Sequence, residues 1–159
     1  MATVAIRDMR WWDISAVHAI EAASFPETAW LVETLWAELA GVPDTRRYWV
    51  AELDDQIVGY AGLMVVGFDA DVQTIAVSGE HRSRGIGTAL LATAMAEATR
   101  RHCSQVMLEV AADNIEASRL YERHGFEAIA RRSSYYGAGR DALVMRVRLT
   151  SSGKERFAT

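Results

Sequence analysis

The stretch that decides the fold is "EHRSRGIGTALL", which runs from Glu80 to Leu91. It sets a histidine and two arginines ahead of Gly85-Ile86-Gly87 and then passes into an apolar, alanine-rich segment. Glycines let the backbone turn tightly and approach a ligand closely, and the N–H groups and dipole at a helix N-terminus attract anions. The pattern therefore predicts a loop that enters a helix and holds an anionic group such as phosphate.

The bulk composition indicates a globular chain. It has 159 residues, 50% of them apolar, so we expect a single domain over residues 1–150 and a flexible polar tail over 151–159. There is no run of about 18 apolar residues and no signal peptide, which gives no reason to expect a membrane partner. The lone Cys103 cannot form an internal disulfide. We therefore expect a soluble, cytoplasmic protein, and the sequence does not define its oligomeric state.

The charge distribution is uneven along the chain. The formal net charge of −4 disfavours direct binding of nucleic acid, which usually needs a basic face. Residues 1–70 hold 4 basic and 11 acidic side chains, whereas residues 71–159 hold 13 basic and 10 acidic ones. An anionic ligand is thus favoured on the C-terminal half and a cationic acceptor on the N-terminal half, although surface charge can also fall unevenly by chance. The histidines and the cysteine show no spacing typical of a metal site, so no metal is expected.

Hydrophobic periodicity and turn residues predict the element order β-α-α-β-β-β-α-β-α-β-β. This order implies an α+β fold, in which about four helices flank a mixed, mostly antiparallel sheet of about seven strands. Asp113 and Glu116 have the spacing of an N-terminal capping box for the last helix, and Gly125 stands where a C-terminal glycine belongs. The strands are expected at 3–9, 47–66 (a hairpin turning at Asp54-Asp55-Gln56), 71–79, 105–111, 126–132 and 141–149, and the helices at 11–25, 30–40, 85–101 and 113–124.

Three kinds of phosphate-binding loop compete for the glycine segment. A Walker loop needs a Gly-Lys-Ser/Thr ending, and the lysine is absent. A dinucleotide fingerprint needs a third Gly or Ala where this chain has Leu90, although Glu109 lies near the expected acidic position. The coenzyme A loop of the GNAT N-acetyltransferases has the pattern Gln/Arg-x-x-Gly-x-Gly/Ala, which Arg82, Gly85 and Gly87 fill. Glycines that begin a helix for steric reasons alone are the remaining explanation.

Glu109 and Tyr121, which lie further along the chain, suggest acid–base chemistry. Glu109 interrupts the strand "QVMLEVA", whose two faces are otherwise apolar. A carboxylate in such a strand should be desolvated, which would raise its pKa toward the range of a general base; an ion pair with one of the many arginines is the alternative. Tyr121 lies beside Leu120 on the apolar side of the last helix, where it could be a core residue or a proton donor to a departing thiolate.

With these residues the chain resembles the GNAT N-acetyltransferases over residues 3–150. More narrowly, it resembles the bacterial ribosomal-protein-alanine N-acetyltransferases of the RimI family. The similar stretches are "TIAVSGEHRSRGIG", "LEVAADNIEASRLYERHGF" and "RRSSYYGAGRDALVM". The last of them, with paired tyrosines followed by Asp-Ala and then Met, is typical of this subgroup.

The resemblance implies that acetyl-CoA is the acetyl donor. The backbone at residues 75–77 would bind the acetyl and pantetheine part, and the loop from Arg82 to Thr88 would hold the pyrophosphate. Asn114 would contact the cofactor near its pantetheine arm. The cofactor-binding residues implied in this way are Ile75, Ala76, Val77, Arg82, Ser83, Arg84, Gly85, Ile86, Gly87, Thr88 and Asn114.

The resemblance also implies direct transfer of the acetyl group to the N-terminal alanine of a small-subunit ribosomal protein. Glu109 would accept the proton of the α-amine, and Tyr121 would protonate the coenzyme A thiolate. Trp30, Tyr135 and Tyr136 would line the acceptor groove. An α-amine has a pKa of about 7.7–8.0 against about 10.4 for lysine, so it needs only a weak base.

Two positions depart from the family pattern and leave the acceptor open. Ala111 stands where an Arg usually follows "LEV", and Leu31 stands where a Ser usually opens the second helix. A GNAT enzyme that acetylates a small-molecule amine or an antibiotic is therefore the alternative. A non-catalytic module that binds coenzyme A is disfavoured by Glu109 and Tyr121, and a nicotinamide-dependent dehydrogenase is opposed by Leu90.

The remaining conspicuous side chains are expected to be structural. Most of the five tryptophans should lie in the core. Cys103 follows His102 directly, and two adjacent residues do not supply the spatial pairing that a cysteine nucleophile needs.

Overall fold

The computed structural model describes residues 3–135 and 139–149. The elements follow in the predicted order, with two additional 3-10 turns, η1 (Trp11–Asp13) and η2 (Gly79–His81). The strands are β1 (Ala5–Asp8), β2 (Arg46–Leu53), β3 (Gln56–Val66), β4 (Asp69–Val77), β5 (Gln105–Ala111), β6 (Glu127–Arg132) and β7 (Ala142–Arg148). The α-helices are α1 (Ile14–Ser24), α2 (Val32–Ala40), α3 (Ile86–Arg100) and α4 (Ile115–Arg123).

The sheet has the strand order β1-β2-β3-β4-β5-β7-β6. The β1–β2, β2–β3, β5–β7 and β6–β7 pairs are antiparallel, and β4–β5 is parallel. The expected hairpin turn is present between β2 and β3, where Asp54 and Asp55 adopt positive φ angles of 50° and 62°. The predicted α+β fold with a mostly antiparallel sheet is confirmed.

The chain forms two compact units, and each is described by itself. The first contains the described residues of Met1–Met64 and Gln73–Ala94, and the second those of Val65–Val72 and Met95–Thr159. The divisions fall inside β3, β4 and α3, so they do not test the expected single domain over 1–150. The tail expected at 151–159 lies outside the described residues. Within the described part of the chain, no helix is long and apolar enough to cross a membrane.

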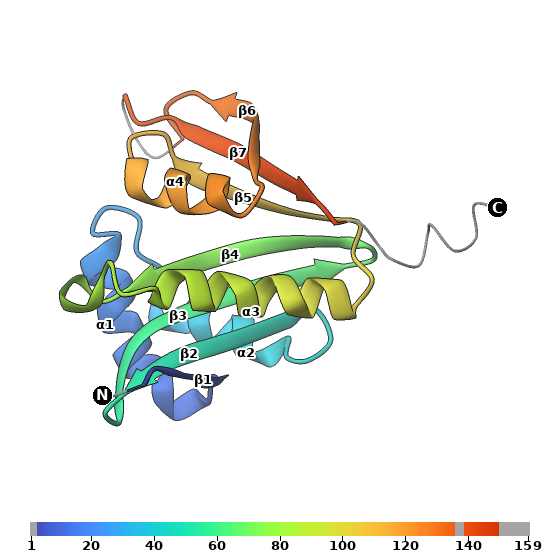
Figure 1. Cartoon of the computed structure of the whole chain (residues 1–159). Coiled ribbons are helices and arrows are strands. Elements are labelled where there is room, and N and C mark those ends of the chain that lie inside the picture. Colours follow the sequence, from blue (N-terminus) through green and yellow to red (C-terminus); the bar gives the residue numbers. More distant parts are fainter. Residues whose placement is uncertain (1–2, 136–138, 150–159) are drawn as a thin grey trace. The chain divides into compact units, whose positions relative to one another are not determined.

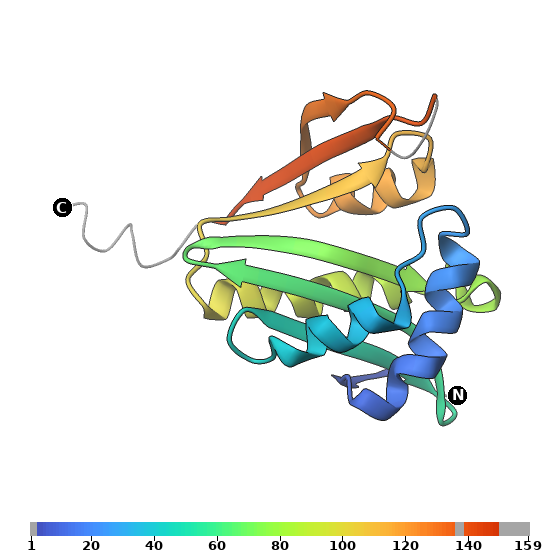
Figure 2. The same cartoon turned by 180° about the vertical axis from the view of Figure 1, so that it is seen from behind.

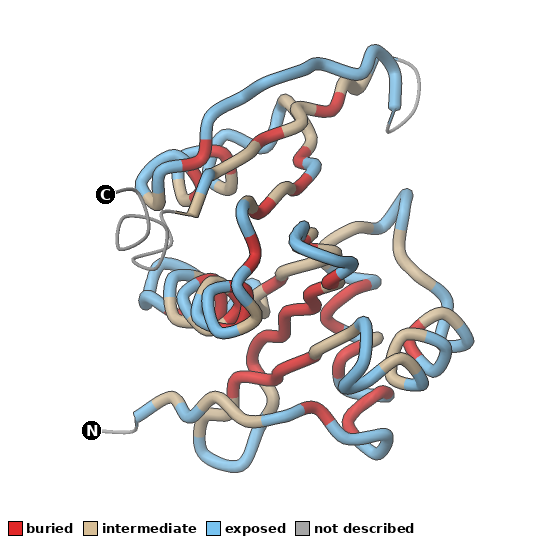
Figure 3. Tube along the Cα trace, turned by 90° about the vertical axis from the view of Figure 1, so that its right-hand side faces the viewer, coloured by how far each residue is buried: buried red, intermediate tan, exposed pale blue. Residues whose placement is uncertain are grey.

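In the first unit, helices cover both faces of the strands. Figures 1 and 2 show α1 and α2 on one face of β2, β3 and β4, and the beginning of α3 on the other. Figure 3 shows the buried residues along the strands and the exposed ones on the outer sides of the helices. The core cluster under α1 and α2 consists of Met9, Ile14, Val17, Ile20, Leu35, Tyr48, Val50, Tyr60 and Ala76.

In the second unit, α4 lies against β5 and β7, with β6 at the edge of the sheet (Figure 1). One face of β5 is buried as predicted, through Val106, Leu108 and Val110. Every residue of β6 is exposed. Strand β5 therefore buries one face, while the face that carries Glu109 is more open.

The N-terminus of α4 corrects one prediction. Asn114 is the N-cap, because its Oδ1 atom accepts a hydrogen bond from the Ala117 N–H at 3.1 Å. Asp113 instead accepts a hydrogen bond from Arg140 Nε at 3.1 Å. The capping box predicted for Asp113 and Glu116 is therefore wrong by one position. The helix ends as predicted at Gly125, which has a φ of +88°.

The tryptophans correct another prediction, because three of the five are exposed. Trp11, Trp12 and Trp36 retain 59%, 61% and 48% of their accessible surface, and Trp49 is buried. The Trp11 ring stacks on Trp36 at 6.1 Å and meets Trp12 edge-on at 5.5 Å. These side chains contact one another at the surface instead of the core, an arrangement that apolar spacing along the chain does not reveal.

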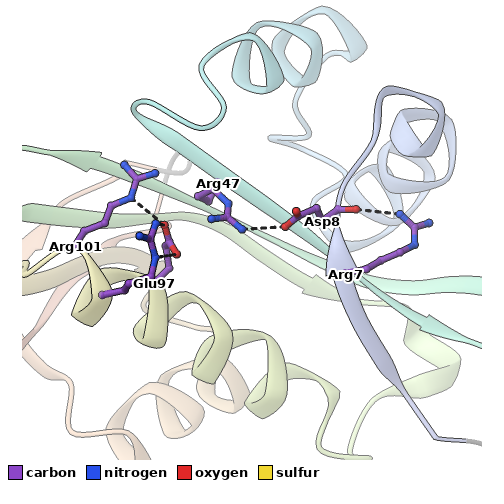
Figure 4. A network of polar contacts seen from close by, with 6 residues as sticks. Arg7, Asp8, Arg47, Glu97 and Arg101 are labelled. Atoms are coloured by element: carbon purple, nitrogen blue, oxygen red, sulfur yellow. Dashed lines mark hydrogen bonds and ion pairs between the residues drawn. The ribbon is translucent and has the colours of Figure 1, made fainter.

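Arginine contacts hold the edge strand β1 in the first unit. Arg47 Nη2 donates to Asp8 Oδ1 at 2.9 Å, and Arg7 Nη1 donates to the Asp8 carbonyl at 3.0 Å (Figure 4). The same figure draws a pair on α3 in the second unit, where Arg101 Nε donates to Glu97 Oε1 at 2.9 Å. The Arg47–Asp8 pair is partly exposed and contributes at most about 1 kcal/mol, so it supports the pairing of β1 with β2 more than the overall stability. Glu97, in contrast, is 7% exposed, and its pair with Arg101 lies at the end of one helix.

A glycine on β3 allows the start of α3 to pack closely on the sheet. A Cβ atom added to Gly59 would lie 3.0 Å from the Ala76 carbonyl oxygen and 3.1 Å from Leu90 Cδ1. Ile86, at the first position of α3, would be 3.4 Å away through its Cγ2 atom. A side chain at position 59 would therefore push α3 away from β3 and β4.

We predict that Gly59→Val lowers the free energy of unfolding by roughly 2 kcal/mol, since overpacking typically costs 1–3 kcal/mol and the Ala76 carbonyl belongs to a strand backbone that cannot move aside. Urea unfolding followed by circular dichroism measures the change. Gly79→Val is the control, because a Cβ atom at Gly79 meets nothing within 4 Å. It should stay within about 0.5 kcal/mol of the wild type. Equal losses in the two variants would show that the close packing is unimportant.

Candidate functional site

The glycine loop belongs to the first unit and begins where β4 ends. The Ser78 N–H donates to the Val58 carbonyl at 2.7 Å, and the His81 N–H donates to the Ser78 carbonyl at 2.9 Å. Arg82 Nε then donates to the Val77 carbonyl at 3.3 Å. These bonds turn the chain sharply after the strand and hold Arg82 beside the strand end.

The loop then enters α3, as predicted. Ser83 and Gly85 adopt positive φ angles of 62° and 79°, and a Cβ atom at Gly85 would meet nothing within 4 Å. Glycine is therefore favoured there by the backbone conformation and not by lack of space. The Ala89 N–H bonds to the Gly85 carbonyl at 3.0 Å, so the N–H groups of residues 86–88 lie at the open end of the helix. Residues 82–85 are exposed.

The strand segment expected to bind the acyl part lies directly before this loop. Ala76 is buried in the core cluster of the first unit, and Ile75 and Val77 are half-buried. Trp30, expected in the acceptor groove, is half-buried and packs against the same cluster. The first unit thus brings together the loop, the strand end and the segment that carries Trp30.

Glu109 lies in the second unit, and its environment differs from the expected one. The residue is exposed, and its Oε1 atom accepts a hydrogen bond from Arg132 Nη1 at 2.7 Å. The predicted desolvation is wrong because Glu109 points from the more open face of β5 and pairs with an arginine of β6. The ion pair that the sequence left as an alternative is present.

Arg132 connects Glu109 to one of the predicted tyrosines. Its guanidinium lies 3.9 Å from the centre of the Tyr135 ring, within cation–π distance. The hydrogen bond to Glu109 raises the pKa of Arg132, so this group stays charged. Sequence reasoning missed Arg132, although it begins the "RSSYY" segment. Tyr136, the second predicted tyrosine, lies outside the described residues.

A second carboxylate, Asp71, shares the sheet face of Glu109. Asp71 pairs with Met107 in the parallel β4–β5 register, and Glu109 follows Met107 by two residues on the same face. Asp71 is half-buried, and burial, followed by the negative charge of Glu109, raises the pKa of its carboxyl group. The environment predicted for Glu109 is therefore found at Asp71. Sequence reasoning missed Asp71 because the sequences of β4 and β5 do not reveal the register in which these two strands pair.

Tyr121 has the buried position that was predicted. It is 5% exposed, and its ring meets Phe126 edge-on at 5.8 Å between centres. Asn114 lies at the start of the same helix, where its side chain is already engaged as the N-cap. Contact of Asn114 with a cofactor stays a prediction. Across residues 3–135 and 139–149, no group of His, Cys, Asp and Glu side chains is arranged to hold a metal ion.

Known proteins resemble this chain both in sequence and in fold. The model of the acetyltransferase (GNAT) family matches residues 8–126. A Bacillus subtilis protein provisionally named as a ribosomal protein bS18-alanine N-acetyltransferase is 34% identical over 142 residues, covering 89% of this chain and 93% of the relative. The N-alpha-acetyltransferase of Sulfurisphaera tokodaii is 32% identical, covering 88% of this chain and 90% of the relative.

A solved structure agrees with these relatives. The crystal structure of the ribosomal-protein-S18-alanine N-acetyltransferase of Escherichia coli superposes with a TM-score of 0.84 and 25% identity, covering 96% of this chain and 97% of that one. The match of the family model, the identity to full-length relatives and the shared fold lead to the same assignment. The chain belongs to the GNAT family of acetyltransferases.

Proposed function

We propose that this enzyme transfers the acetyl group of acetyl-CoA to the α-amine at the N-terminus of a protein, with the N-terminal alanine of a ribosomal protein as the acceptor. The names of the B. subtilis and E. coli proteins support the acceptor class. The observation that carries the donor assignment is the loop at residues 82–88, which combines arginines, positive φ angles and the open end of α3.

The loop suits the pyrophosphate of coenzyme A for three physical reasons. Arg82 and Arg84 are exposed and can donate charge-assisted hydrogen bonds to phosphate oxygens. The space beside Gly85 admits an anion close to the backbone. The N–H groups of residues 86–88 and the positive end of the α3 dipole add to the attraction.

In the reaction, the α-amine nitrogen attacks the thioester carbonyl carbon. The new C–N bond forms, the C–S bond breaks, and the amine proton passes to Glu109, directly or through a water. About a tenth or more of an α-amine with a pKa of 7.7–8.0 is already neutral at pH 7. An exposed carboxylate is therefore sufficient as proton acceptor, and its negative charge also attracts the ammonium form. The raised pKa of Asp71 makes it a second group on this face that can hold the proton.

Tyr121 is proposed to protonate the departing thiolate. A phenol is a slightly weaker acid than a thiol, with reference pKa values of about 10 and about 8.5, and this small difference allows a phenol to supply the proton as the C–S bond breaks. The packing of the ring against Phe126 keeps the side chain in one orientation.

A thiol-release assay tests the reaction and the acceptor together. With acetyl-CoA, a peptide that begins with a free alanine should release coenzyme A at about ten times or more the rate of the same peptide with a blocked N-terminus, because only the free amine can attack. Small polyamines are assayed in parallel. Faster release with the polyamines than with the peptide would support the small-molecule alternative and contradict the protein acceptor.

Substitution of the two carboxylates tests the proton acceptor. Glu109→Gln should lower kcat about tenfold or more and leave the KM for acetyl-CoA nearly unchanged, because a base acts on the amine and not on the donor. Asp71→Asn is the matched comparison on the same face and should have a smaller effect. A Glu109→Gln enzyme as active as the wild type across the pH range would contradict the assignment, and a larger loss in Asp71→Asn would transfer the role to Asp71.

Arg82→Ala tests the donor loop. Loss of one charge-assisted bond to phosphate should raise the KM for acetyl-CoA about tenfold, with a smaller change in the KM for the peptide. Steady-state kinetics with each substrate varied in turn measures both constants. Arg123→Ala, an exposed arginine of α4, is the control and should leave both values unchanged. An unaltered acetyl-CoA KM in Arg82→Ala would exclude the loop as the phosphate site.

A further inference from the structure

Glu21, near the C-terminal end of α1, is a buried carboxylate that the proposed chemistry does not use. It is 2% exposed, and its hydrogen-bond donors are neutral groups. Taking a carboxylate out of water is costly unless several donors compensate it. A carboxylate in the core of the first unit must therefore be held by its donors, and these donors show which parts of the chain it connects.

The contacts of Glu21 hold both ends of the α1–α2 loop. Its backbone carbonyl accepts the Phe25 N–H at 2.9 Å, where the loop begins. Its carboxylate atom Oε2 accepts the Trp30 N–H at 3.1 Å, where the loop ends. One residue thus fixes the span of a loop whose first and last aromatic side chains, Phe25 and Trp30, pack against the core cluster.

The other carboxylate oxygen connects this loop to two strands. Oε1 of Glu21 accepts the Tyr60 hydroxyl of β3 and the Thr74 hydroxyl of β4, the latter at 3.3 Å. The two hydroxyl oxygens lie 3.1 Å apart. Thr74 immediately precedes the segment 75–77 that is expected to bind the acyl part of the donor.

From this geometry we propose that Glu21 is a positioning residue for the acceptor. It sets the loop that carries Trp30 against the strand that receives the acetyl group, and so determines how an acceptor peptide is held. The proposal rests on the proposed function for its link to the acceptor. Its structural half, that Glu21 holds the loop through Trp30, is independent of any activity.

Three substitutions of Glu21 distinguish the effect of its hydrogen bonds to the loop from the effect of its negative charge. Glu21→Gln can still accept the Trp30 N–H through its carbonyl and can donate its amide N–H groups to the two hydroxyls, so it should preserve the loop. Glu21→Leu removes every side-chain hydrogen bond at similar volume and leaves the backbone bond to Phe25 in place. Glu21→Asp keeps the charge but withdraws it by one methylene, which also serves if Glu21→Leu does not fold. Glu122→Leu, an exposed glutamate of α4, is the matched control.

The first measurement is hydrogen exchange of the Trp30 amide, followed by NMR. We expect exchange at least about tenfold faster in Glu21→Leu and Glu21→Asp, because the acceptor of this N–H is lost, and little change in Glu21→Gln and Glu122→Leu. Unchanged exchange in Glu21→Asp and in a folded Glu21→Leu would overturn the proposal. This result does not depend on whether the enzyme acetylates a peptide.

The second measurement is the KM for the acceptor peptide against that for acetyl-CoA. Glu21→Leu and Glu21→Asp should raise the peptide KM about fivefold or more and change the acetyl-CoA KM by less than about twofold, and Glu21→Gln should restore both. A purely structural role would lower the active fraction without this split. Faster exchange at Trp30 with an unchanged peptide KM would overturn the link to the acceptor, whereas a wild type that acetylates no peptide refutes the proposed function itself.

Discussion

The close approach of α3 to β3 and β4 at Gly59 is the constraint on which the rest of the first unit depends. Because position 59 has no side chain, the Ala76 carbonyl and the side chains of Leu90 and Ile86 lie within 3.4 Å of the point that a Cβ atom would occupy. The end of β4 and the start of α3 are therefore fixed to the same point. The loop between them must turn within a few residues, which leads to the positive φ angles at Ser83 and Gly85.

Much of the fold was predictable because its signals are local. The order of elements, the hairpin at Asp54-Asp55, the loop into α3 and the end of α4 at Gly125 each depend on a short pattern of apolar spacing or turn residues. The wrong predictions concern features that a short sequence pattern does not decide. The N-cap is Asn114 and not the predicted Asp113. Both residue types can cap a helix, so the sequence alone does not distinguish them. The surface position of Trp11, Trp12 and Trp36 depends on a contact between η1 and α2.

The environments of the carboxylates Glu109, Asp71 and Glu21 likewise depend on residues that are distant in the sequence. The sequence analysis placed a candidate base on β5 and assigned the desolvated environment to Glu109. That environment belongs to Asp71, which reaches the face through the β4–β5 register. Arg132 reaches Glu109 from β6, 23 residues along the chain. Glu21 forms contacts with residues as far as Thr74, and nothing near Glu21 in the sequence distinguishes it from a surface glutamate.

The exposed strand β6 has a consequence for association between copies of the chain. An edge strand offers unpaired backbone groups to which another sheet can add, and natural proteins counter this with short edges, bulges and charged side chains. Strand β6 has a register shift between Ala128 and Ala130 and ends in Arg131 and Arg132. At the opposite edge, β1 is only four residues long and carries Arg7. Both borders of the sheet are therefore protected against the strand addition that leads to aggregation.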